Sequence, residues 1–458
     1  MKKLIYILLA AVCMAGTASV MSAQQNNTRT AYFLDDYTYG YRLNPAFSSG
    51  SNFVAIPVLG NISLGAETNV GISNFLYPTS GGKLTLFIDD SISAQDFLGG
   101  LKDESKVNAN LNLTLLAAGF RTGNLYHTVD VSLKAYENTL LPKSLFSFAK
   151  MNTSAGDTAW EIGNIGLGLN AYGEIAYGIS ASIGESLRVG ARAKILMGLA
   201  HADMLIDRLD LSMTEDNWTA STTGSIAVAG PLKFAANGST LNLSEIEFGG
   251  MKGLSGFGLG FDLGASYDFL DYFTASVSLL DLGFMGWKGV TQAHSTGSSS
   301  YYFDGFGTIS SGEDLSNQLE GFTDELLSLI QFETSGTGSK TSSLSATLNA
   351  GVEAKMPFYD RLSFGLLASH RFNGAYSWTE GRLSANVNPV DFIGIAASCG
   401  VSNYGGSFGG VVNFVFPGFN FFLGVDSFMC KVSPQFIPVK KLNTNLALGF
   451  NITFGQED

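Results

Sequence analysis

Two long stretches of the chain alternate between apolar residues and small, polar or charged residues. In the first stretch the apolar positions are Leu344, Ala346, Leu348, Ala350, Val352, Ala354 and Met356. In the second stretch they are Leu446, Leu448, Phe450, Ile452 and Phe454. Because a β-strand turns successive side chains to opposite faces, each stretch predicts a strand with one apolar and one polar face. Strands of roughly ten residues are long enough to cross a bilayer at a tilt.

The same alternation recurs along most of the chain. It is cleanest over 256–269, where Phe257, Leu259 and Phe261 oppose glycines and Asp262. Further strands are expected at 61–72, 110–120, 128–136, 167–183, 188–199, 272–284, 362–371, 376–387, 392–401, 408–416 and 419–428, with a less regular region at 204–230. The pattern predicts an all-β fold, a transmembrane antiparallel β-barrel of about 14 strands.

The connections between these strands differ in length. Short ones fall at 184–186, 270–271, 357–360, 388–389 and 417–418, whereas long loops are expected at 137–160, 231–255 and 287–342. Short turns on one side and long loops on the other are typical of outer-membrane barrels. Within the longest loop, Leu315, Leu319, Phe322, Leu326 and Leu329 recur at helical spacing and predict a short amphipathic helix over 313–332. Such a helix packs on the barrel, or it serves as a gate or docking element.

The N-terminus has the pattern of an export signal. Two lysines, an apolar stretch and small residues predict a signal peptide over 1–23, cleaved after Ala23 or Ala18. Lipidation at Cys13 is disfavoured, because Val12 stands where lipidation signals have a small residue. Residues 24–50 have neither helical nor strand period, so we expect a plug-like N-terminal segment with a turn at Asn44, Pro45 and Ala46. The barrel would then occupy residues 51–458.

Composition supports a barrel over a soluble protein. Charged residues make up 14% of the chain, against about a quarter in soluble domains. The segment 392–425 has no charged residue, but Ser, Asn, Gly and Pro interrupt it too often for a membrane-spanning helix. A net charge of −13 argues against nucleic acid as a partner. Cys399 and Cys430 remain after signal removal; a disulfide between them is allowed, and two unpaired thiols are the favoured interpretation.

Charged residues within the strand pattern alternate with apolar neighbours and should therefore face the lumen, since charge on the lipid side is costly. Two roles are open to them. They can pair with one another and brace the interior, or they can line a polar path or hold the N-terminal segment. The expected lumen-facing residues are Glu174, Arg188, Arg192, Lys194, Asp262, Glu353 and Lys355.

Signals for catalysis or metal binding are weak. Residues 405–409 match the G-x-S-x-G pattern around Ser407, but they lie between two strands, and that motif needs a strand-to-helix turn. The four histidines lack metal-ligand spacing. We therefore expect no enzyme activity, no catalytic residue, no metal and no cofactor. Phenylalanines crowd the C-terminal strands, where they form a lipid-facing surface or line an apolar pocket: Phe408, Phe414, Phe416, Phe419, Phe421, Phe422 and Phe428.

Four short motifs resemble an uncharacterised family of outer-membrane barrels of Bacteroidota, a domain of unknown function. They are YRLNPA at 41–46, LPKSLF at 141–146, YGEIAYG at 172–178 and DLGFMGW at 281–287. The family is distantly similar to the long-chain fatty-acid transporter and PorV-type barrels. The first likeness implies a 14-stranded barrel with an N-terminal plug and a hydrophobic ligand path. The second implies a docking platform for other proteins.

These patterns predict a protein of the outer membrane of a Gram-negative bacterium, in contact with outer-membrane lipid. Its expected function is to pass or bind small, apolar molecules. The alternative is a non-enzymatic docking platform for secretion or envelope-assembly proteins, motivated by the acidic loop 287–342.

Overall fold

The computed structural model describes residues 28–78, 84–87, 89, 91–151, 158–214, 218–250, 253–301, 331–429 and 441–455. The expected signal peptide over 1–23, nearly all of the helix expected over 313–332, and Cys430 lie outside these residues. Within them, one antiparallel sheet closes into a barrel of 14 strands, as the alternating pattern predicted.

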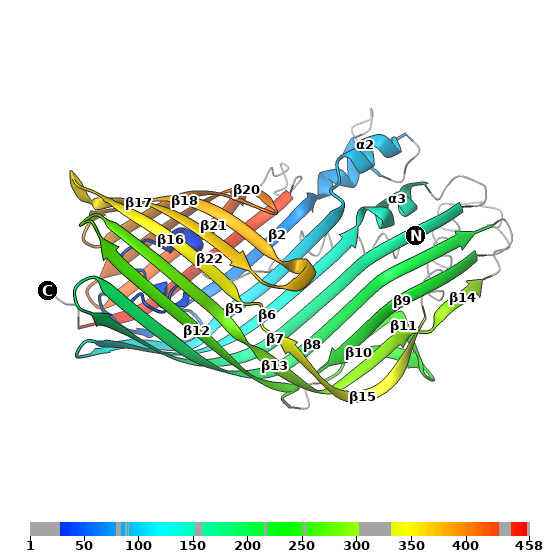
Figure 1. Cartoon of the computed structure of the whole chain (residues 1–458), viewed down its shortest axis with the longest axis horizontal. Coiled ribbons are helices and arrows are strands. Elements are labelled where there is room, and N and C mark those ends of the chain that lie inside the picture. Colours follow the sequence, from blue (N-terminus) through cyan, green and yellow to red (C-terminus); the bar gives the residue numbers. More distant parts are fainter. Residues whose placement is uncertain are drawn as a thin grey trace.

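The wall of the barrel is a continuous ring (Figure 1). Its first strand is interrupted and consists of β1 (Asn52–Ala55) and β2 (Ile62–Gly71). Both parts pair with β22 (Lys441–Phe454) on one side and β5 (Glu104–Thr122) on the other, which closes the ring. From β5 the ring continues through β6 (Leu125–Pro142), β7 (Thr158–Ile183), β8 (Leu187–Met213), β12 (Gly256–Phe269), β13 (Phe273–Ser295), β16 (Thr347–Met356), β17 (Tyr359–Arg371), β18 (Trp378–Val390), β19 (Ile393–Ser402), β20 (Gly405–Phe416) and β21 (Phe419–Met429).

The outer face of the ring is apolar and the inner face is polar. In β16, Leu348 and Val352 are 39% and 43% exposed on the outside, while Asn349 and Glu353 are buried inside. Strand β12 repeats this arrangement, with its phenylalanines outside and glycines inside. An outer surface of this kind is stable in contact with lipid and would aggregate in water.

The short turns lie at the end of the barrel that contains the C-terminal end of β22 (Figure 1). The backbone N–H of Thr453, near that end, donates to the carbonyl of Gly418 in the β20–β21 turn. Gly184 and Gly418 occupy such turns with φ of 65° and 96°, a conformation that costs glycine little.

The opposite end carries a β-extension that replaces two of the expected long loops. β9 (Trp218–Ala229) inserts between the C-terminal parts of β8 and β13, which lie far from the short turns. β14 (Gly297–Tyr301) pairs with β9. β15 (Phe332–Ser343) pairs with β13, and the hairpin β10 (Leu232–Asn237)–β11 (Thr240–Phe248) joins its edge. The loop expectation for 231–255 and 287–342 was therefore wrong over these segments. Their sequences do not alternate over a long span, and pairing with distant strands makes them extended.

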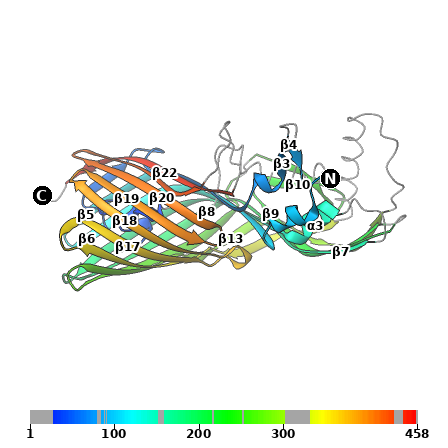
Figure 2. The same cartoon turned by 90° about the horizontal axis from the view of Figure 1, so that it is seen from above.

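Two helices and a small hairpin pack against the β-extension (Figure 2). They are α2 (Ala94–Gly99), α3 (Lys143–Met151) and the pair β3 (Leu76–Pro78)–β4 (Leu84–Leu86). Phe97 and Phe146 are fully buried there. The loop expected at 137–160 is thus largely the end of β6, α3 and the start of β7. No helix within the described ranges is long and apolar enough to span a membrane.

The interruption of the first strand is a local outward bulge. Ala55 pairs with Asn451 and Ile62 with Leu448, so the six residues 56–61 stand opposite only two residues of β22. Val58 and Leu59 at its tip are 45% and 46% exposed, and Val58 has φ of 69°. Since a β-branched residue rarely adopts this conformation, the bulge holds local backbone strain.

Candidate functional site

The N-terminal segment, residues 28–50, lies inside the barrel (Figure 1). It contains two short 3-10 turns, η1 (Arg29–Ala31) and η2 (Gly40–Arg42). The Ser278 hydroxyl on β13 donates to the Leu43 carbonyl at 2.8 Å, and Thr38 donates to Asn420 on β21 at 2.8 Å. Since β13 and β21 are well separated around the ring, the segment bridges the lumen.

A track of glycines on the inner wall accommodates this segment. A Cβ atom on Gly351 would lie 2.7 Å from Phe33, and one on Gly424 would lie 2.8 Å from Thr28. Both distances are shorter than real Cβ contacts, so these two side chains of the segment lie against the wall where a glycine leaves room for them. The glycine track comprises Gly190, Gly264, Gly351, Gly365, Gly394, Gly409 and Gly424.

Aromatic rings pack where the N-terminal segment meets the wall behind the bulge. Tyr37 and Tyr39 lie 5.1 Å and 5.8 Å from Phe422, and Tyr39 lies 5.7 Å from Phe53, measured between ring centroids. All four rings are buried. Burial raises the pKa of the Tyr37, Tyr39 and Tyr41 hydroxyls above their ordinary value, so the three side chains stay neutral. We call Tyr37, Tyr39, Tyr41, Phe53 and Phe422 the aromatic cluster.

A central ion network joins the N-terminal segment to one wall. Asp130 accepts from Arg42 of the segment at 2.9 Å and from Arg192 at 2.7 Å. Arg192 also donates to Asp262 at 3.0 Å, and Lys194 lies 2.6 Å from that carboxylate. The side chains of these residues are at most 4% exposed.

The same network continues with three more residues and has no excess charge. Lys194 donates to Asp281 at 2.6 Å, and Lys134 donates to Glu174 at 2.7 Å. Each acid in the network faces at least one cation, which is the condition under which buried charges are tolerated. Four cations, Arg42, Arg192, Lys194 and Lys134, thus balance four acids, Asp130, Asp262, Asp281 and Glu174.

A second group of ion pairs holds the beginning of the N-terminal segment. The Arg29 backbone N–H donates to Asp426 at 2.6 Å, and its guanidinium lies 3.2 Å from Glu380 and 3.5 Å from Glu67. Arg382 donates to Glu380 at 2.8 Å. These five residues, the Arg29 cluster, come from the segment and from three parts of the wall: β2, β18 and β21.

The turn at Asn44, Pro45 and Ala46 is docked on the wall. The Asn44 side chain donates to the carbonyls of Ala265 and Val277, both at 3.2 Å, and accepts from the backbone N–H of Ala46 at 2.9 Å. A side chain that bonds its own turn while satisfying two wall carbonyls fixes both the turn and its position.

The seven predicted lumen-facing residues fall into two groups. The structure brings Glu174, Arg192, Lys194 and Asp262 into the central ion network, and their side chains are buried. Arg188, Glu353 and Lys355 lie apart from it, toward the short turns. Arg188 pairs with Asp268 at 3.1 Å and Lys355 lies 3.7 Å from Asp35, and both cations are about two-fifths exposed.

Sequence reasoning missed most of the partners of these residues. Asp130 and Lys134 alternate with Val129, Val131 and Leu133, so the pattern that selected Arg192 and Lys194 could also have found them. Arg29 and Arg42 carried no such signal, because the N-terminal segment has no strand period. Their roles depend on where the segment lies in the barrel.

Other sequence features take ordinary places in the wall. Ser407 lies within β20, with no helix after it, and its hydroxyl accepts from Arg382 at 3.4 Å. Phe408 and Phe419 are 60% and 47% exposed outside, but Phe422 is buried in the aromatic cluster. His201 is buried, and its ring is stacked on Trp287 with 4.8 Å between the ring centroids.

Cys399 is an exposed cysteine on the outside of β19, and its pairing with Cys430 stays untested. Across the described ranges, no group of three or more His, Cys, Asp or Glu side chains is placed to hold a metal.

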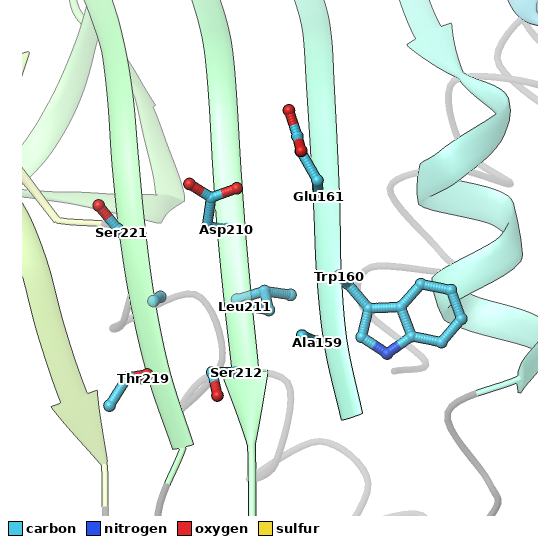
Figure 3. A pocket seen from close by; sticks show the side chains of 9 residues that line it. Ala159, Trp160, Glu161, Asp210, Leu211, Ser212, Thr219 and Ser221 are labelled. Atoms are coloured by element: carbon cyan, nitrogen blue, oxygen red, sulfur yellow. The ribbon is translucent and has the colours of Figure 1, made fainter. Parts of the chain in front are cut away.

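One pocket of about 480 Å³ lies on the β-extension rather than in the lumen (Figure 3). Three adjacent strands, β7, β8 and β9, form its floor. Glu161 and Asp210 stand at one end of the pocket, while the Trp160 ring packs on Phe148 of α3 at 5.8 Å.

Comparison with known proteins gives a family but no activity. The model of a family described as a family of unknown function (DUF5723) matches residues 45–426. This match confirms the resemblance to a family of unknown function that the four motifs indicated. No curated protein matches the chain.

Several solved barrels are similar in fold at low identity. The toluene transporter TbuX of Ralstonia pickettii is 10% identical, with 97% of this chain and 98% of that chain covered and a TM-score of 0.44. The toluene transporter TodX of P. putida is 8% identical, with coverage of 98% and 99% and a TM-score of 0.41. A FadL homologue of Pseudomonas aeruginosa is 9% identical, with 98% of each chain covered and a TM-score of 0.37.

Proposed function

Because the chain belongs to the family of unknown function DUF5723, we propose a function from its own geometry: an outer-membrane barrel that binds and passes small apolar molecules. The apolar outer face supports the location. Antiparallel barrels with such a face and with one end closed by short turns are the form that outer membranes contain.

The observation that carries the proposal is the bulge at 56–61 in front of the aromatic cluster. There the regular register with β22 is interrupted, although Phe450 still donates to the Leu59 carbonyl at 2.9 Å. The exposed Val58 and Leu59 form an apolar lip on the lipid side. A Cβ atom on Gly60 would lie 3.0 Å from the Tyr39 hydroxyl, so the aromatic cluster begins directly behind the bulge. An apolar molecule crossing here would pass from buried rings to lipid, with the paired Arg42 guanidinium 4.8 Å from the Tyr39 ring on the inner side.

The N-terminal segment acts in this proposal as a plug that keeps the lumen closed to water and ions. Arg42 and the Arg29 cluster hold it at two points, and the glycine track allows it to fit closely against the wall. A plugged lumen leaves the wall as the exit for an apolar ligand, and the bulge is where the register of the first strand is interrupted.

Removal of the bulge tests this function. Deletion of residues 57–60 leaves two residues opposite Gly449 and Phe450, so β1 and β2 become one continuous strand with the same inward and outward faces. Cells with this variant should take up the apolar fluorescent probe N-phenylnaphthylamine as slowly as cells that lack the protein. In the matched control, Ser-Gly-Ser-Gly replaces residues 57–60, which keeps the gap, and uptake should persist.

Native mass spectrometry of the protein purified from its own outer membrane gives an independent readout. A retained apolar mass in the intact protein, lost in the deletion variant, supports the proposal. Equal uptake by the intact protein and the deletion variant, with no retained mass in either, contradicts it.

The second candidate is a docking platform, and the β-extension with its pocket favours it. The extension projects beyond the barrel, and at one end of the pocket two acids, Glu161 and Asp210, share one cation, Arg208. A protein companion that co-purifies with the intact chain and is lost on Asp210→Arg, with unchanged probe uptake, would favour this candidate. Asp360→Arg, the same change of charge at an exposed residue of β17 beside a short turn, serves as the control.

A further inference from the structure

Three neighbouring strands place a row of hydrogen-bond donors on the inner wall. Arg371 of β17 pairs in register with Thr347 of β16 on one side and with Trp378 of β18 on the other. All three side chains point into the lumen, at 8%, 1% and 2% exposure. Directly paired residues of antiparallel strands have Cβ atoms about 5 Å apart. The row therefore presents its polar groups to one small volume.

These polar groups have no partner within the described part of the chain. The Nε and Nη1 atoms of Arg371, the hydroxyl of Thr347 and the indole Nε1 of Trp378 are all buried and make no hydrogen bond. Buried donors nearly always find acceptors in folded proteins, so a cluster of orphaned donors calls for an explanation. What the row lacks is an acceptor.

The carboxylates near the row interact with other cations, although Glu67, which pairs with Arg29 at 3.5 Å through Oε1, has a buried Oε2 that makes no hydrogen bond. Arg371 interacts electrostatically with Asp281, but Asp281 is ion-paired with Lys194 at 2.6 Å. Glu380, two residues from Trp378 on β18, is bound by Arg29 and Arg382. No ion pair of Arg371 occurs among the described residues, whereas the buried Arg192 and Arg382 both pair with carboxylates.

An aromatic ring from the opposite wall covers the guanidinium. The Arg371 guanidinium lies 5.3 Å from the ring centroid of Tyr136 on β6, across the lumen. Arg29 stacks on Trp378 at 4.3 Å, but its charge is engaged by Glu67, Glu380 and Asp426. A ring can partly offset the cost of burying a cation but supplies no hydrogen-bond acceptor.

We infer that Thr347, Arg371 and Trp378 form a binding site for an oxyanion, a carboxylate or a phosphate group. Planar carboxylate and phosphate oxygens match the donor fork of arginine, and adjacent hydroxyl and indole donors complete the set. The site does not depend on the proposed passage of apolar molecules, because it lies on β16–β18 and the bulge lies between β22 and β5.

Binding of two simple anions to the purified full chain in detergent tests the site. Isothermal titration with sodium benzoate and, separately, inorganic phosphate should show one saturable site for at least one of them. Benzyl alcohol, which has the ring of benzoate without the carboxylate, should not bind there. Benzoate binding alone assigns an organic carboxylate, and phosphate binding assigns a phosphate group.

Substitutions distinguish this site from anion binding elsewhere. Arg371→Gln should weaken binding about tenfold or more, since it removes the charged donor, and Thr347→Val should weaken it less. The control Arg361→Gln changes an exposed arginine that pairs with Asp391 at the rim, and it should leave binding unchanged. No saturable binding, or equal binding by Arg371→Gln, overturns the inference.

Thermal unfolding without anion gives a second readout. If Arg371 is unpaired, Arg371→Gln removes an uncompensated buried charge and should keep or raise the Tm. A clear fall in Tm would mean that a carboxylate of the protein itself occupies the row, and it would also overturn the inference.

Discussion

Asp130 is the central residue of the ion network, because it links the N-terminal segment to the wall. Its two carboxylate oxygens separately accept from Arg42 and Arg192. Removal of one charge from a buried network leaves its partners desolvated without compensation, which costs more than the pair itself contributes. The effect of such a change should therefore be large.

Asp130→Asn should destabilise the protein by about 3–5 kcal/mol, since two buried guanidinium groups lose their shared charge. Denaturant unfolding of the detergent-solubilised protein measures the change. The matched control Asp391→Asn removes an exposed carboxylate that pairs with Arg361 at 2.6 Å. It should cost about 0–1 kcal/mol. Similar losses for the two variants would refute the interpretation of a buried network.

The glycine track yields a second prediction at the residue scale. In Gly365→Val the new side chain would overlap the Phe33 ring, so the N-terminal segment must move. The expected cost is about 1–3 kcal/mol, typical of overpacking. Limited proteolysis should then cut within residues 28–50. Gly381→Val, where a Cβ meets nothing within 4 Å, should resist cleavage as the native protein does.

At the scale of elements, the β-extension has its own apolar core, separate from the lumen. Phe97 of α2 and Phe146 of α3 are fully buried in it, and the ring centroids of Phe97 and Phe87 lie 4.2 Å apart. The short helices are held by this packing, because isolated helices of such length are not stable in water.

Phe146→Ala should therefore loosen the helices without opening the barrel. Loss of a buried phenylalanine costs about 3–5 kcal/mol. Hydrogen exchange should rise in α2 and α3 and stay slow in β16–β20. Phe358→Ala, at a turn residue that is 81% exposed, is the control and should leave exchange unchanged. Uniform acceleration over the whole chain would argue against a separate core.

The turn before α2 gives a prediction on pH. Hydrogen bonds from the Ser91 hydroxyl and backbone N–H and from the Thr85 hydroxyl lower the pKa of the Asp89 carboxyl to about 2. A lowered pKa means that the charged form stabilises the fold above the ordinary pKa and that this contribution is lost as pH falls toward 2. At pH 4, hydrogen exchange at residues 85–87, 89 and 91 should be slower in the native protein than in Asp89→Asn, and this difference should disappear as the pH falls toward 2.

At the scale of the whole molecule, the N-terminal segment and the wall form one unit. Deletion of residues 24–50 removes Arg29 and Arg42, uncovers the glycine track and leaves the lumen lined by polar residues. We expect this variant to conduct ions in planar bilayers, whereas the intact protein stays closed. Conductance that does not differ between the two would show that something other than the segment closes the lumen.

Much of the barrel could be predicted from the sequence, because the two-residue period of apolar side chains in a strand is a local property. A strand in a bilayer must show an apolar side chain outward at every second position, so β12, β16 and β22 could be recognised one at a time. The same rule selected Glu174, Arg192, Lys194 and Asp262 as inward-facing. It could not say which charges meet, since pairing depends on register between strands far apart in the chain.

The sequence by itself determined the fold class, the approximate number of strands, and which face of each strand is apolar. Only the tertiary structure decided that the segments after β8 and β13 form a β-extension and that the N-terminal segment lies on a glycine track. It also decided that Arg371 has no carboxylate partner among the described residues while Arg192 has two. These outcomes depend on contacts between residues distant in sequence. The local sequence pattern does not predict such contacts, because the side chains of a strand alternate in the same way whichever residues face them across the lumen.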